Sequence, residues 1–78
     1  MEKQIGGVLA SYYNKTLLIS NNRYYIIKGS NKVGTEIEFD TSDAIPMPSY
    51  MFAIAAMNEE DLDSTLDYIH SKWFDKNN

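Results

Sequence analysis

The chain has 78 residues, a formal net charge of −4 and a pI near 4.7, and it contains one histidine and no cysteine. A chain of this length is typical of one small domain with a modest core. The lack of cysteine excludes disulfide bonds, and a single histidine without cysteine excludes a zinc cluster. The acidic balance argues against a direct nucleic-acid binder, which normally gathers Lys and Arg on one face.

No segment of the sequence approaches the ~20 consecutive apolar residues of a membrane span. Residues 1–10 are charged and include Gly6 and Gly7, so they lack the apolar centre of a secretion signal. We therefore expect a cytoplasmic protein that binds no membrane, metal or cofactor. Six Lys against one Arg, with many Asn, Ile and Tyr, indicate A/T-rich codons, which are typical of a low-GC bacterium or one of its phages.

The first predicted element is a strand over residues 5–13. Gly6 and Gly7 interrupt it, and glycines inside a strand are typical of a bulge or of a close approach by another backbone. Asn14 and Lys15 are then expected to turn the chain into the next strand.

A hairpin is predicted over residues 16–28, with its turn at Asn21 and Asn22, because asparagine tolerates the positive φ of a two-residue turn. This turn pairs Ser20 with Arg23 and fixes the register of the preceding pairs. One face is then the expected core side and holds Leu17, Ile19, Tyr24 and Ile26. The other face is mixed but too apolar for an ordinary solvent face, so we expect something to cover it; it holds Thr16, Leu18, Ser20, Arg23, Tyr25 and Ile27.

Residues 33–39 alternate apolar and polar side chains, which predicts a half-buried strand with Glu36 and Glu38 on its solvent side. Residues 40–48 contain two prolines and are expected to form a long connection. Residues 50–57 are apolar throughout and suit either a buried strand or an Ala-rich helix. We favour the strand, because the following helix has a start signal of its own.

An amphipathic C-terminal helix is predicted over residues 59–74. Asn58 is its expected N-cap, and Asp61 stands three residues later, as in a capping box. Acidic residues crowd the first turn, where the helix dipole favours negative charge. An apolar stripe recurs at helical spacing and consists of Leu62, Leu66, Ile69 and Trp73.

Together these elements predict a single α+β domain over residues 1–74, followed by a frayed tail at residues 75–78. A small antiparallel sheet of about four or five strands is expected to pack one face against the C-terminal helix. The predicted core joins the helix stripe to Leu17, Ile19, Tyr24, Ile26, Ile37, Phe39, Phe52 and Ile54. Because the second sheet face is also apolar, we expect a homodimer or a protein partner.

Charge is distributed unevenly along the chain. No Lys or Arg lies between Lys32 and Lys72, and this stretch holds nine carboxylates: Glu36, Glu38, Asp40, Asp43, Glu59, Glu60, Asp61, Asp63 and Asp67. These acids suit either a solvated surface with a well-started helix or, the capping residue Asp61 excepted, a contact surface for a basic protein partner. The spacing of Asp40 and Asp43 is not that of a calcium loop, so we expect no metal site.

The sequence shows no set of residues that is typical of catalysis. His70 is the single imidazole, and no serine stands in a nucleophile motif. We interpret His70 as a polar residue on the flank of the helix, and we expect no enzyme.

Two tyrosine pairs, Tyr12-Tyr13 and Tyr24-Tyr25, fall on predicted neighbouring strands. In each pair, one ring must face away from the core if the other faces it. Tyr12 and Tyr25 beside Arg23 suit interface anchors, or a stacking pocket between subunits for a nucleotide or another anion. The alternative is ordinary packing of aromatic side chains across the strands.

The main functional hypothesis is a small acidic, non-enzymatic interaction protein. It would be an inhibitor or adaptor of phage or mobile-element type that engages a basic surface of a protein partner, such as a nucleic-acid-binding site. Two alternatives stay open. One is a homo-oligomeric binder of a nucleotide or another anion, and the other is a subunit of a larger assembly.

Overall fold

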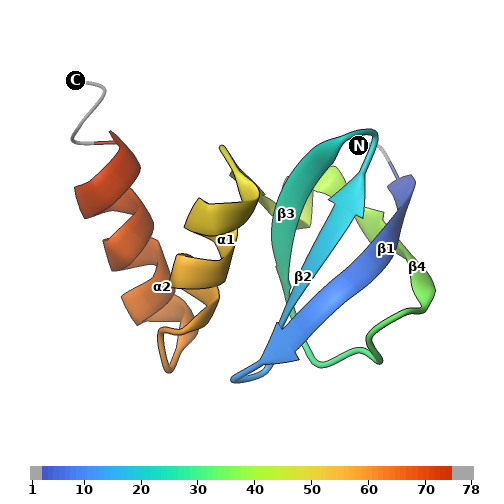
Figure 1. The fold of residues 1–78 in the computed structure, drawn as a ribbon, viewed down its shortest axis with the longest axis horizontal. Coiled ribbons are helices and arrows are strands. Elements are labelled where there is room, and N and C mark those ends of the chain that lie inside the picture. Colours follow the sequence, from blue (N-terminus) through green and yellow to red (C-terminus); the bar gives the residue numbers. More distant parts are fainter. Residues whose placement is uncertain (1–2, 75–78) are drawn as a thin grey trace.

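The computed structural model describes residues 3–74, except for the side chains of residues 73 and 74, and shows a curled sheet followed by two short helices (Figure 1). The strands are β1 (Lys3–Tyr12), β2 (Lys15–Ser20), β3 (Arg23–Lys28), β4 (Glu36–Asp40) and β5 (Ile45–Met47). The helical elements are the 3-10 turn η1 (Thr41–Asp43), α1 (Tyr50–Met57), α2 (Leu62–Ile69) and the π-turn η2 (His70–Phe74). The predicted tail at residues 75–78 lies outside the described residues.

The five strands form one sheet in the order β4-β1-β2-β3-β5, and every pairing is antiparallel. The predicted hairpin is confirmed: Ser20 lies opposite Arg23, and Asn21 and Asn22 have φ angles of 53° and 64°. The preceding turn is at Tyr13 and Asn14, one residue earlier than the sequence predicts, and both residues there also have positive φ.

The sheet curls until its concave face closes on itself. The rings of Tyr25 on β3 and Phe39 on β4 have centroids 5.3 Å apart, although three strand spacings, about 14 Å in a flat sheet, separate these strands. A β-bulge between Val8 and Ala10 helps to bend β1. The resulting inner core consists of Leu18, Tyr25 and Phe39, with Ile27, Ile37 and Ala44 packed against it.

The second apolar face of the hairpin is therefore covered by this chain itself. Leu18 and Tyr25 are buried, and Phe39 from β4 provides the cover that the sequence left unidentified. The expectation of a homodimer rested on this face being open. That argument does not hold, because curling of the sheet removes the open surface.

Glycine at position 6 favours this closure. A Cβ atom at Gly6 would lie 2.8 Å from Leu18 Cδ1 and 3.1 Å from Phe39 Cε1, so a larger residue would force these buried side chains to shift. The sequence predicted a bulge or the close approach of another backbone at the glycine pair; the nearest neighbours of Gly6 are instead two side chains, and the bulge lies between Val8 and Ala10.

The outer face of the sheet carries the helices. Figure 1 shows α1 between the sheet and α2, so that α1 is covered on two sides. This second core includes Leu17, Ile26, Met47, Ala53, Ala56, Met57 and Ile69. Phe52 on α1 meets Tyr68 on α2 with ring centroids 5.6 Å apart.

The prediction of a strand over residues 50–57 is wrong, because this segment is helix α1. Its apolar sequence suits a helix that is buried on more than one side. The start signal is Ser49, whose hydroxyl accepts a hydrogen bond from the Phe52 N–H at 3.2 Å. We expected one C-terminal helix, whereas the described chain has two short ones.

The predicted N-cap of the last helix is also wrong. Asn58 is the C-cap of α1, and Asp61 caps α2 by accepting a hydrogen bond from the Ser64 N–H at 2.7 Å. The stripe lies inward as predicted, with Ile69 buried and Leu62 and Leu66 half-buried. The side chain of Trp73, its predicted last member, lies outside the described residues.

Candidate functional site

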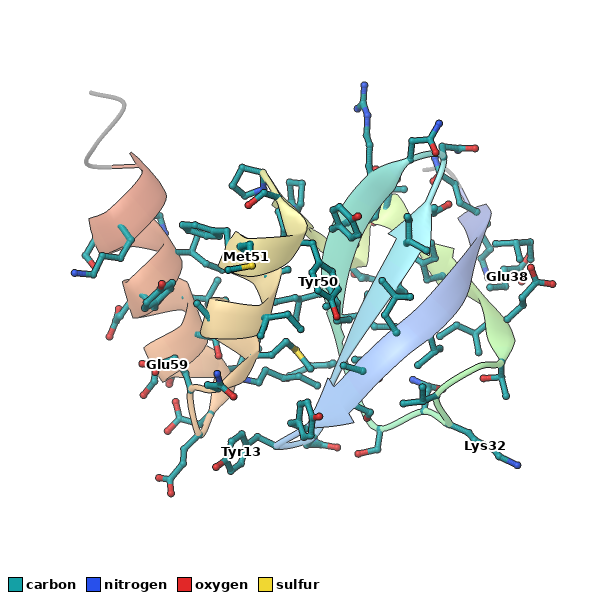
Figure 2. All side chains as sticks on the ribbon, in the orientation of Figure 1. Tyr13, Lys32, Glu38, Tyr50, Met51 and Glu59 are labelled. Carbon is teal, nitrogen blue, oxygen red and sulfur yellow. The ribbon has the colours of Figure 1, made fainter. Side chains whose placement is uncertain are left out.

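The acidic residues form two groups on different parts of the molecule. The β4 group, on β4 and η1, comprises Glu36, Glu38, Asp40 and Asp43, whereas the α2 group comprises Glu59, Glu60, Asp61, Asp63 and Asp67. Figure 2 places Glu38 and Glu59 toward opposite ends of the molecule, whose longest extent is 33 Å. The stretch without Lys or Arg therefore does not form a single acidic surface.

In the β4 group, Glu36, Glu38 and Asp40 share the outer face of the sheet. The carboxylate of Asp40 accepts hydrogen bonds from the Ser42 N–H at 2.9 Å and the Ser42 hydroxyl at 2.8 Å. These hydrogen bonds hold the pKa of Asp40 below its ordinary value. Asp40 thus serves as the cap of η1, while Glu36 and Glu38 are exposed and have no hydrogen bond from any described side chain.

A hollow of about 460 Å³ lies where β3 and β4 face each other across the curl. It is lined by Ile27, Lys28, Glu38, Phe39, Asp40 and Asp43. The lining mixes one base with three acids. Nowhere in the described part of the chain do three His, Asp or Glu side chains converge in a way that suits a metal ion.

The α2 group divides in the same way into capping and exposed acids. Hydrogen bonds from the Ser64 backbone and hydroxyl lower the pKa of Asp61, which caps α2. Asp63 and Asp67 are one helical turn apart and exposed, on the side of α2 away from the buried Thr65. A shallower hollow of about 410 Å³ is lined by Glu59, Ser64, Asp67, Tyr68 and Ser71.

Lys15 is a structural residue that the sequence analysis did not single out. Its side chain is only 1% exposed, and Nζ donates hydrogen bonds to the Glu59 carbonyl and the Thr65 hydroxyl, both at 2.5 Å. Burial lowers the pKa of Lys15, and the carboxylates of Glu59 and Asp61 partly oppose that shift. Lys15 thus ties β2 to the start of α2. The sequence does carry a signal for this burial: Lys15 is two residues before Leu17, so both side chains lie on the core side of the strand.

The proposed anchors Tyr12, Arg23 and Tyr25 do not come together in one molecule. Tyr25 is buried in the concave core. Tyr12 lies opposite Lys15 at one end of β2, whereas Arg23 lies opposite Ser20 at the other end, about 17 Å away along the strand. This geometry removes Tyr25 from any stacking pocket and leaves Tyr12 and Arg23 as separate exposed residues.

Comparison with known protein families, curated protein sequences and solved structures finds no match to this chain. Among residues 3–74, no helix combines the length and the hydropathy that a membrane span requires.

Proposed function

We propose that this protein is a small acidic, non-enzymatic interaction protein that engages a basic surface of a protein partner. One observation supports this most directly. Asp40 and Asp61 are used as helix caps, whereas the side chains of Glu36, Glu38, Asp63 and Asp67 are exposed, and their carboxylates accept no hydrogen bond from any described residue. These four carboxylates remain available to a partner.

These four charges contribute little to the stability of the fold, because they are solvated surface charges. Their main physical effect is on the rate of association with a partner. Carboxylates gathered on an exposed surface speed encounters with a basic partner and discriminate against acidic ones. An inhibitor or adaptor of phage or mobile-element type, acting by covering a basic site on its target, uses this property.

Two variants with the same net charge test the proposal. The Glu36→Gln/Glu38→Gln variant and the Asp63→Asn/Asp67→Asn variant each remove two negative charges, but from different acidic groups. The partner is captured by crosslinking at low salt, identified and purified, and its binding kinetics are measured by surface plasmon resonance at two salt concentrations. We expect one variant to associate about tenfold more slowly than the parent at low salt.

That variant should also lose most of the salt dependence of the association rate, because exposed charges are screened over about 8–10 Å. Both variants should keep the unfolding free energy of the parent. If both associate as fast as the parent, the acids only solvate the surface. If both slow association equally, net charge acts without a defined contact surface. Either of these results contradicts the proposal.

A further inference from the structure

The outer face of the sheet is only partly covered by the helices. Helix α1 contacts β2, β3 and β5, and Figure 1 shows no helix over β1 and β4. On this open part, the side chain of Ile5 is 58% exposed. Most of this large apolar side chain is therefore left uncovered by the described molecule.

Ile5 belongs to an apolar surface that we call the open strip, consisting of Ile5, Gly7 and Ile19. Gly7 lies opposite Ile19 on β2, and Ile5 is two residues from Gly7 on β1, so all three share the outer face. Figure 2 shows Tyr50 on one side of this region and Glu38 on the other, with β1 and β2 between them. Tyr50 stacks obliquely on Tyr24, with ring centroids 5.7 Å apart, and forms the wall on the side of α1.

Gly7 is a second observation that points to an occupant. Its φ is not positive, and a Cβ atom there would lie 3.8 Å from Ile19 Cγ2, an ordinary contact. The fold therefore has room for a Cβ atom at this position, whereas at Gly6 a Cβ atom would displace its neighbours. Glycine inside a strand weakens the strand and allows another chain to approach its backbone closely.

The border of the open strip away from α1 is acidic. Glu36 lies opposite Gly7, and Glu38 lies opposite Ile5, both on the outer face of β4 and both exposed. A partner that covers the strip with apolar side chains therefore meets carboxylates along one flank. Charge complementarity then requires Lys or Arg on that flank of the partner. A second copy of this chain would instead bring another pair of carboxylates to the interface.

We propose that the open strip docks an amphipathic helix of a partner protein, with its apolar face on the strip and with Lys or Arg beside Glu36 and Glu38. This inference rests on the proposed function, and it adds where the partner binds and which side chains the partner presents. Strands are spaced about 4.8 Å apart, and packed helices lie about 8–10 Å apart. A helix beside α1 would therefore lie two strands further along, over β1, with Glu36 and Glu38 of β4 on its flank, and would extend the helical layer.

The probe for this test is a synthetic helical peptide with Leu at positions i, i+3, i+4 and i+7 and Lys along one flank. The control peptide has Glu in place of Lys. Each is titrated into the ¹⁵N-labelled full chain and followed by NMR. We expect the Leu/Lys peptide to shift the amide signals of Ile5, Gly7, Ile19, Glu36 and Glu38, and the Leu/Glu peptide to bind at least about tenfold more weakly.

Substitutions at two apolar residues with nearly equal exposed fractions distinguish binding at the open strip from nonspecific binding to exposed apolar side chains. Ile5→Ser should weaken binding of the Leu/Lys peptide about tenfold. Val33→Ser changes a side chain that is 57% exposed in the loop between β3 and β4, and it should leave binding unchanged. Gly7→Ala, which the fold accommodates, should also weaken binding. Circular dichroism checks that each variant is folded.

Equal weakening by Ile5→Ser and Val33→Ser, or amide shifts centred on α2, would overturn the inference. Sedimentation that shows a dimer, made monomeric by Ile5→Ser, would identify a second copy as the occupant and overturn it as well. The Glu36→Gln/Glu38→Gln and Asp63→Asn/Asp67→Asn variants show whether only the docking site is wrong or whether the proposed function is wrong as well. If only Asp63→Asn/Asp67→Asn slows association with the captured partner, the open strip is wrong and the proposed function stands. If neither variant does, the proposed function fails.

Discussion

The two faces of the sheet bury their apolar residues in different ways. The concave face is closed by the chain's own curl, so that Leu18 is inaccessible to solvent and Phe39 is buried without any helix. The outer face depends on an added layer: Leu17 is inaccessible to solvent beneath the helices, whereas Ile5, beyond them, is largely exposed. Apolar residues of the concave face therefore serve the fold, and those of the open strip are available for binding.

The largest expected difference in stability is between alanine substitutions of a buried and an exposed tyrosine. Tyr25→Ala removes a buried ring that packs against Phe39, and we expect it to lower the unfolding free energy by about 3–5 kcal/mol. Tyr12→Ala removes a ring that is 56% exposed, and it should cost no more than about 0.5 kcal/mol. Urea unfolding of both variants measures the difference. Equal losses would mean that the concave face is not closed.

The anchoring of the helices on the outer face gives the next prediction. Lys15→Ala removes the two hydrogen bonds from the buried ammonium group to Glu59 and Thr65, and we expect a loss of about 2–3 kcal/mol in unfolding free energy. Lys28→Ala, at the facing position on β3, removes an exposed charge and is the matched control. A Lys15→Ala variant as stable as Lys28→Ala would contradict the anchoring role.

The pH dependence of stability tests the same contact. Because the folded state lowers the pKa of Lys15 below its ordinary value of 10.5, the unfolded state binds its proton more tightly. The unfolding free energy of the parent should therefore rise with pH between the lowered pKa and 10.5, relative to a Lys15→Met variant. The two proteins differ at this one residue, so the difference between the two curves isolates Lys15. Parallel curves would show that Lys15 keeps its ordinary pKa.

The sheet was more predictable from the sequence than the helices. The hairpin follows from local signals, since Asn21 and Asn22 accept positive φ and the turn fixes the register. The segment over residues 50–57 carries no periodic signal, because α1 is apolar on all sides, and its type depends on tertiary packing. The start of α2 was misplaced because the Asn58-Glu59-Glu60-Asp61 stretch contains two residues that suit an N-cap.

The candidate site was less predictable, because it depends on contacts between distant segments. The acidic residues are evident in the sequence, but their division into two groups follows from the separate placement of β4 and α2. Alternation along the hairpin gives the face of each residue. It does not show that Phe39 covers Tyr25, which depends on how far the sheet curls.

The smallest effect is expected from alanine substitutions at the two adjacent glycines, since Gly6 lies on the concave face of the sheet and Gly7 on the outer face. Gly6→Ala places a Cβ atom against Leu18 and Phe39, and overpacking of this kind costs about 1–3 kcal/mol. Gly7→Ala places a Cβ atom in ordinary contact with Ile19, and the less flexible unfolded chain should leave stability unchanged or raise it by up to about 1 kcal/mol. For a domain of this size, each kcal/mol corresponds to about 4–8 °C in Tm. The Tm of Gly6→Ala should therefore fall below that of the parent, whereas the Tm of Gly7→Ala should stay the same or rise. If Gly7→Ala lowers Tm as much as Gly6→Ala, the space above Gly7 is already filled by this chain, and the open strip has no room for a partner helix.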